Sequence, residues 1–538
     1  MIVSRKTAKS RTPTKAYTTF SSSCNKHNKS TSDITQSSAL STMHLNFIPI
    51  VAVASFTVAS FILIFATHAE FPLAQLSSAS SVRNCRIPFR PTSAWAEEDT
   101  TAQVQHVRTA LSESITELGY NPPDPVAVES WAVLIHSSME APYRKYHALN
   151  HAFELSEGAD ADPIEILSAL FHDVVQYSVD GDLTDSQRNI LGTSIIPTDE
   201  NGYALSKEIA DSDLAMVLSV FGRTAGEVVV GPSVQRGGNE LLSAMIAVRS
   251  LQNVLSTKHL LAITACHEMT IPFRKIDTHG QSDTDRLRER LTQTNEAFGI
   301  GMDIIELDEV VHKAVRLANR DVAAFQSPDP ALFVSNSLQL ILETSPNLLS
   351  PKSFTIDNYV SALKGSEHFL SGLDPRDIFP SFKGTPNSSQ IYEMRTRCTR
   401  NLDIAVRYLR AILTELYVVS AISVLTGEDV PMMLFWEDDS FLLEETQIKH
   451  CSHDFCIPGD GEEAWCSLSH PSSNVDEEVY CLLESFKSRL AAFLYKILGD
   501  NGIENLLLSS KATTFPMTKD SAKSLLETIP KCAVEYIL

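Results

Sequence analysis

Two histidines, His147 and His151, lie four residues apart in the segment YHALNHA (146–152). On a helix, side chains at this spacing share one face, with Cβ atoms about 5–6 Å apart. Both imidazoles are therefore expected to face one pocket, where they could bind a metal ion. A histidine pair alone is equally compatible with core hydrogen bonds or a surface position, so the interpretation depends on further residues.

Three more residues of metal-ligand type follow on two predicted helices. His172 and Asp173 are adjacent near the end of an apolar segment, 162–177, and Asp321 lies in a second one, 305–326. Apolar residues three and four positions away place the Asp321 carboxylate on the apolar face of its helix.

A buried carboxylate without a partner is very costly. Asp321 is therefore expected to be protonated, paired with an arginine such as Arg316 or Arg320, or bound to a metal ion. An arginine partner would leave the adjacent His172 and Asp173 unexplained, which favours the metal.

Together these residues offer two imidazoles and two carboxylates, from His151, His172, Asp173 and Asp321. Mixed nitrogen and oxygen ligands suit a divalent ion, and Mn, Fe, Ni, Zn and Mg all remain open. A bound cation lowers the pKa of water towards neutrality, which is the usual basis of metal-dependent hydrolysis.

The order His, His-Asp, Asp on helices resembles the HD superfamily of metal-dependent phosphohydrolases. YHALNHA resembles the YHNxxHA element of cyclic-nucleotide phosphodiesterases and the YHxxxH start of bacterial HD hydrolases. ALFHDVV resembles the HD helix, and the likeness continues over residues 141–326 through the segments NELLSA (239–244), ITACHEMTIPFR (263–274) and AVRLANRDV (314–322). A helical extension to about residue 435 is similar to long bacterial HD-domain proteins.

This resemblance implies a role for each candidate. His151, His172, Asp173 and Asp321 would bind the metal, and His147 would be the general acid that protonates the leaving oxygen. Gln176 stands where the phosphodiesterases carry a histidine of their two-metal centre, and Ala148 replaces their asparagine. Whether the site binds one ion or two therefore stays open. Gln176 and His267 are additional candidates for contact with the metal.

The expected activity is hydrolysis of a small phosphorylated substrate, a nucleotide-like phosphomonoester or phosphodiester. Two other classes stay open: a catalytically degenerate HD fold that serves as a binding or regulatory module, and an HD-type di-iron oxygenase. The oxygenase needs further histidines around a second iron, and Gln176 counts against it.

The elements that must position these residues are predicted to be helices. Asp162 and Pro163 are a typical N-cap and first helical residue, and Glu165 lies where a capping box has an acid. Helices are also expected at 402–425 and at 478–498, the latter ended by Gly499. Breaks are expected at 192–203 and 277–301, and GEVVVG (226–231) is a short strand candidate.

The fold class is thus all-α, an HD-type helical bundle with extra C-terminal helices and a disordered N-terminal region that carries one hydrophobic helix. The predicted parts are a disordered basic Ser/Thr-rich region (1–46), a transmembrane or signal segment (47–67), a linker or transit-like segment (68–98), an HD-type metal-binding domain (99–330), a helical extension (331–435), an acidic Cys/His-bearing loop (436–475), and a C-terminal helix and tail (476–538).

The net charge of −22 argues against a nucleic acid polymer as partner, because the field repels a polyanion. The first 45 residues are the exception, with seven Lys and Arg against one acid. Residues 47–66 contain no charge and are long enough to cross a membrane. Serines and arginines follow in 71–96, so organelle targeting, to a plastid for example, is expected, with a single-pass membrane anchor as the alternative.

Four of the nine cysteines fall in one short stretch near histidines: Cys451, Cys456, Cys466 and Cys481. Their irregular spacing favours free thiols or one disulfide over a structural zinc site. No sequence feature indicates the oligomeric state.

Overall fold

The computed structural model describes residues 100–121, 123–157, 162–231, 236–345, 348, 355–427, 472, 474–508 and 517–537. Within these residues the protein is mostly α-helical, as predicted, with one small three-stranded sheet. The expectations for residues 1–98 and for the cysteines and histidines of 450–470 lie outside the described residues.

The first core of buried apolar side chains belongs to the helices that carry the candidate site. These are α2 (Thr100–Glu117), α3 (Pro125–Met139), α4 (Leu149–Ser156), α5 (Pro163–Phe171), α6 (Tyr177–Asp180), α7 (Asp185–Leu191), α8 (Ser212–Phe221), α9 (Gly238–Leu251), α10 (Thr257–Met269), α11 (Asp283–Ala297) and α12 (Ile304–Asp321). Short 3-10 turns occur at Gly192–Ser194 and Ala323–Gln326.

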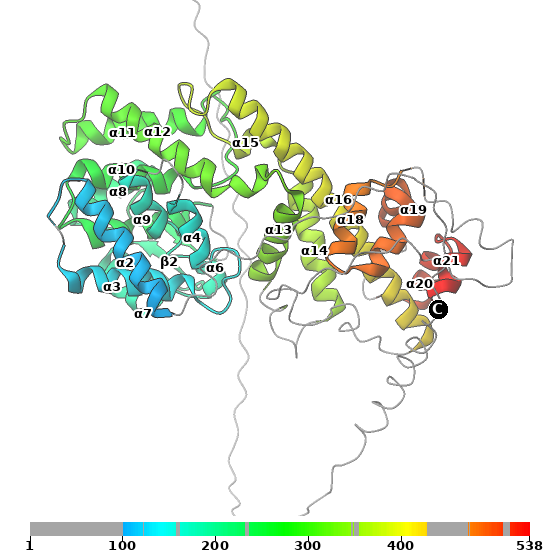
Figure 1. Ribbon diagram of the computed structural model, residues 1–538. Coiled ribbons are helices and arrows are strands. Elements are labelled where there is room, and N and C mark those ends of the chain that lie inside the picture. The colour runs from blue at the N-terminus through cyan, green and yellow to red at the C-terminus, as the bar shows by residue number, and fades with distance from the viewer. Residues whose placement is uncertain are drawn as a thin grey trace, which may run out of the picture. The chain divides into compact units, whose positions relative to one another are not determined.

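Helix α10 is the centre of this core. Every residue from Leu260 to Met269 is buried, so the helix has no solvent face, and it packs against α5, α8, α9, α11 and α12 (Figure 1). A helix buried on all sides fixes the relative positions of the helices around it. Helices α5 and α12, which carry candidate ligands, are both among them.

Two expected breaks contain regular structure. Helix α11 occupies most of 277–301, and its buried stripe consists of Thr284, Leu287, Leu291 and Thr294, too few apolar residues to produce a clear helical period. The strands β1 (Ile195–Thr198) and β2 (Gly202–Leu205) form an antiparallel hairpin within 192–205, and β2 pairs with β3 (Val228–Val230). Only β3 was expected, because four-residue strands show little alternation.

A second core comprises α13 (Pro330–Thr344), α14 (Ile356–Ser371), α15 (Pro375–Ile378), α16 (Ser388–Thr426), α18 (Glu477–Ser485), α19 (Arg489–Leu508), α20 (Lys519–Leu526) and α21 (Lys531–Ile537). The single helix expected at 478–498 is wrong: the segment forms α18 and α19, and α19 continues to Leu508 past Gly499, whose φ of +63 interrupts it. Among the described residues, α16 alone is long and apolar enough to span a membrane, and 67% of its apolar window is buried inside the protein.

Candidate metal centre

The candidate residues lie at helix ends. His151 is in the first turn of α4, His172 directly follows α5, Asp173 lies in the turn after it, and Asp321 is the last residue of α12. The expectation that His147 and His151 share a helix is wrong, because α4 begins only at Leu149 and His147 lies before its N-cap. The two rings nevertheless lie near each other, with centroids 6.1 Å apart.

The structure brings four predicted side chains together. The Nε2 atom of His151 lies 3.0 Å from Oδ1 of Asp321, and the same oxygen is 3.7 Å from Nε2 of His172. Nε2 of His172 is 2.9 Å from Oδ2 of Asp173. The ligand atoms of His151, His172 and Asp173 all lie within 4.8 Å of one another.

Two of these atoms are buried without a hydrogen-bond partner: Nε2 of His172 and Oδ2 of Asp173. Nδ1 of His172 lies 2.7 Å from the Ala169 carbonyl, which can only accept, so Nδ1 carries a proton. In the neutral ring, Nε2 then carries only a lone pair. This lone pair faces a lone pair of the Asp173 carboxylate, and the two repel each other. A cation between the two atoms removes the repulsion, so these residues fit a divalent ion.

In the absence of an ion, a proton on Nε2 of His172 can take the place of that cation. Burial alone would lower the pKa of His172, yet the carboxylates of Asp173 and Asp321 raise it well above its usual value. Burial would likewise raise the pKa of Asp321, but the neighbouring imidazoles of His151 and His172 lower it to about 2. The site therefore holds carboxylates in their charged form in a buried place, which is the charge state that a cation needs.

Among the residues that the structure describes, no arginine pairs with Asp321. Arg316 and Arg320, its expected alternatives, each lie 2.8 Å from the fully buried carboxylate of Glu165. Glu165 therefore ties α5 to α12, and Asp321 stays available to the imidazoles of His151 and His172.

His147 is held by a residue that the sequence analysis missed, Glu343 near the end of α13. One carboxylate oxygen of Glu343 accepts a hydrogen bond from Nδ1 of His147. The other accepts the backbone N–H groups of Lys145, Tyr146 and His147 at 2.9, 2.8 and 3.0 Å. The Glu343 side chain is fully buried, whereas that of His147 is 22% exposed.

The pKa of His147 is raised. Burial would lower it, but Asp173 and Glu343 outweigh burial. A raised pKa favours the protonated form of the ring, which is the form that the expected general acid needs. The position of Glu343 could have been noticed, because an acid in the last turn of a helix opposes the helix dipole and needs a compensating contact.

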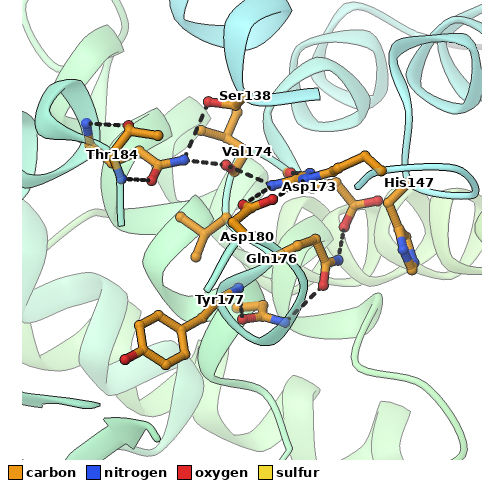
Figure 2. Close-up of polar contacts among 12 residues, drawn as sticks. Ser138, His147, Asp173, Val174, Gln176, Tyr177, Asp180 and Thr184 are labelled. Carbon is orange, nitrogen blue, oxygen red and sulfur yellow. Dashed lines mark hydrogen bonds and ion pairs between the residues drawn. The ribbon is translucent and has the colours of Figure 1, made fainter. Parts of the chain in front are cut away.

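Arg144 is a second residue that the sequence did not indicate, and it joins the two segments that carry the candidate ligands. Its side chain is buried, with Nη1 2.5 Å from the carbonyl of Asp173 and with Nε and Nη2 2.9 and 2.6 Å from the two carboxylate oxygens of Asp180. Figure 2 shows Asp180 beside the Asp173–Val174 turn.

The additional candidates, Gln176 and His267, lie close to the centre but differ in what they contact. Nε2 of Gln176 donates to Oδ1 of Asp173 at 2.8 Å (Figure 2). His267 is fully buried on α10, and its Nδ1 donates to the Ile263 carbonyl at 2.9 Å, the backbone contact expected of a helix-end histidine. Burial lowers the pKa of His267 to about 4, so the ring is neutral.

The sequence matches no protein-family model, and neither curated proteins nor solved structures include a match. The function is therefore inferred from the residues and their geometry.

Proposed function

We propose that this protein is a metal-dependent phosphohydrolase built on an HD-type helical bundle. The observation that carries the proposal is the convergence of Nε2 of His151, Nε2 of His172, Oδ2 of Asp173 and Oδ1 of Asp321, with two of these atoms buried and unpartnered. Such a set of nitrogen and oxygen donors is typical of a divalent ion that participates in hydrolysis.

His151, His172, Asp173 and Asp321 would hold the ion. When bound, a divalent ion supplies an acidified water and neutralises charge on phosphoryl oxygens. The chain orients its ligands through contacts behind them: the Ala169 carbonyl sets the tautomer of His172, and Gln176 holds one oxygen of Asp173.

His147 would protonate the leaving oxygen. Glu343 occupies Nδ1 and anchors the backbone around the histidine, so the proton on Nε2 is the one available for transfer. Asp173 and Glu343 raise the pKa of His147 against the effect of burial, which favours the protonated form that a general acid needs. A fixed and charged donor is worth about 10²–10⁴-fold in rate in enzymes of known mechanism.

The substrate class follows from charge and from the HD resemblance. A polyanion is disfavoured by the net charge of −22, while a small phosphate ester can be held by the ion itself. We therefore propose a small phosphomonoester or phosphodiester, nucleotide-like in character.

The test combines metal analysis with an activity screen of the full chain. Elemental analysis should find a divalent metal in the wild-type protein, and phosphorylated metabolites with added Mn²⁺ should include a substrate that releases phosphate or a monoester product. His172→Ala and Asp173→Ala should lose both metal and turnover, whereas His279→Ala, at an exposed histidine, should keep both. Full phosphatase activity in the first two variants refutes the assignment. A protein without metal would be a binding module, and one with two irons an oxygenase.

A further inference from the structure

Tyr146 lies beside both the proposed general acid and a proposed metal ligand. The centroid of its ring is 4.8 Å from that of His147 and 5.3 Å from that of His151. The centroids of the two histidine rings are 6.1 Å apart, so the three rings form a compact triangle. The phenol of Tyr146 is thus part of the wall of the candidate centre, although the proposed function assigns it no role.

The backbone of Tyr146 is anchored by the second core. Its N–H donates to Oε2 of Glu343 at 2.8 Å. The N–H groups of Lys145 and His147, on either side, donate to the same oxygen at 2.9 and 3.0 Å. The Glu343 side chain is fully buried, so three bonds to one buried oxygen hold this segment in place. The phenol therefore starts from a fixed backbone before any substrate binds.

The hydroxyl of Tyr146 points away from Glu343 and towards the candidate metal ligands. The ring is tilted by 35° from that of His151, whose Nε2 lies 3.0 Å from Oδ1 of Asp321. Burial raises the pKa of the phenol, and the carboxylates of Asp321 and Asp173 raise it more strongly than that of Glu343 does. Because Coulomb interactions weaken with distance, the hydroxyl lies nearer to these two carboxylates than to Glu343.

This hydroxyl makes no hydrogen bond within the part of the chain that the structure describes. Its ordinary pKa of about 10 leaves the proton in place at neutral pH, so the hydroxyl is a neutral donor. The side chain is half-buried, and neither Asp173 nor Asp321 accepts its hydrogen. The candidate centre therefore contains a donor that is not committed to a protein acceptor.

The position of this donor suits a bound phosphoryl group. In the proposed reaction the phosphorus must lie close to the ion, and its leaving oxygen must lie close to His147. Tyr146 adjoins both places, because its ring contacts those of His147 and His151. Fixed donors stabilise the charge that develops on phosphoryl oxygens. A neutral phenol can do so without the strong pairing to the metal-binding carboxylates that a lysine or an arginine would make.

We infer that the Tyr146 hydroxyl donates a hydrogen bond to a nonbridging phosphoryl oxygen of the substrate, which makes Tyr146 a substrate-binding residue of the centre. This inference rests on the proposed function and separates binding of the phosphoryl group from binding of the metal. Tyr146 acts on the substrate and not on the ion, so loss of its hydroxyl weakens phosphate binding and leaves metal binding unchanged.

The probe is inorganic phosphate, titrated calorimetrically into the Mn²⁺-loaded full chain of wild type and of Tyr146→Phe. Phenylalanine keeps the ring with its contacts to His147 and His151 and removes only the hydroxyl. We expect an unchanged Mn²⁺ content and a dissociation constant for phosphate about 10- to 100-fold higher, the effect of losing one hydrogen bond to a charged group. Tyr143→Phe, at a tyrosine that is 48% exposed three residues earlier, is the matched control and should bind both as wild type does.

Wild-type phosphate affinity in Tyr146→Phe, or an equal loss in Tyr143→Phe, overturns the inference and leaves the metal-dependent hydrolase standing. So does a Mn²⁺-loaded wild type that binds no phosphate. Loss of Mn²⁺ from Tyr146→Phe also overturns the inference, since the hydroxyl would then support the ion. A wild-type chain that binds no Mn²⁺ overturns the proposed function and the inference together.

Turnover provides a second readout, with the substrate found by the phosphatase screen. The value of kcat/KM for Tyr146→Phe should fall about 10²–10³-fold, as when one donor to the developing charge is removed from an enzyme. The Tyr143→Phe variant should keep the wild-type value. An unchanged kcat/KM in Tyr146→Phe contradicts the inference.

Discussion

The contact between Glu343 and His147 gives the sharpest prediction, the effect of Glu343→Gln. Glutamine keeps one oxygen, which can still accept the backbone N–H groups of Lys145, Tyr146 and His147. Its amide nitrogen then faces Nδ1 of His147 and can only donate, so Nδ1 must be an acceptor. The charged form of His147 loses its carboxylate partner while the local fold is retained.

The size of the effect follows from the nature of this bond. The Glu343 carboxylate is fully buried, and a hydrogen bond between charged groups is worth about 1.5–3 kcal/mol. If His147 must carry its proton when the leaving oxygen departs, that loss appears in the activation barrier. At about 1.4 kcal/mol per factor of ten, turnover should fall about 10- to 100-fold.

The assay compares kcat, KM and bound metal in wild type and Glu343→Gln with the substrate found by the phosphatase screen. Metal content and KM should be close to wild type, because Glu343 touches none of the four predicted ligands. Glu129→Gln, at a half-exposed carboxylate 3.4 Å from Arg108, serves as control and should keep full kcat. Unchanged kcat in Glu343→Gln would refute the role of this pair, and loss of metal would show that Glu343 supports the centre as a whole.

Two further predictions concern stability, measured by urea unfolding in the presence of a chelator. Arg144→Ala should lower the free energy of unfolding by about 3–5 kcal/mol, because Asp180 and the Asp173 carbonyl lose a buried partner; Arg108→Ala, in an exposed pair, should cost less than about 1 kcal/mol. Equal losses in the two variants would contradict this reasoning. Burial raises the pKa of Glu415 in α16 to about 7, against an ordinary value of 4.5. The folded protein therefore holds this proton more tightly than the unfolded chain, and the free energy of unfolding should fall as pH rises from 4.5 to 7, by an amount on the order of 3 kcal/mol. Glu415→Gln should remove that pH dependence and be the more stable protein at pH 8, and a variant that is less stable there would show that the charged form is favoured.

Local patterns predicted much of the helical structure around the site. Asp162 caps α5 through the N–H groups of Ile164 and Glu165, with Pro163 as the first helical residue. The same pattern predicted that Glu165 belongs to a capping box, and this was wrong. Its carboxylate instead pairs with Arg316 and Arg320, on a helix about 150 residues further along the chain. Capping chemistry acts over three or four residues, whereas a buried ion pair depends on the tertiary fold.

The proximity of the proposed ligands was within reach of sequence reasoning because each has a local signal. His172 and Asp173 end an apolar helix, and Asp321 interrupts the apolar face of another. The residues behind them have weaker signals: Arg144 is an ordinary charged residue before YHALNHA, and Glu343 is a single acid near the end of a helix. Their roles depend on partners 29 and 196 residues away.

The turn after His172 illustrates why these supporting residues matter. Helix α5 ends at Phe171, and a helix end leaves backbone groups without intrahelical partners. Here side chains of other segments satisfy them: Arg144 and Gln187 donate to the carbonyls of Asp173 and Val174, while Ser243 and Asn239 accept from the N–H groups of Val175 and Tyr177. A turn whose backbone is held from four separate points cannot rotate Asp173 without breaking several hydrogen bonds at once. The fold therefore fixes the Asp173 carboxylate in advance, which would lower the ordering cost of binding the proposed ion and favour a single geometry at the centre.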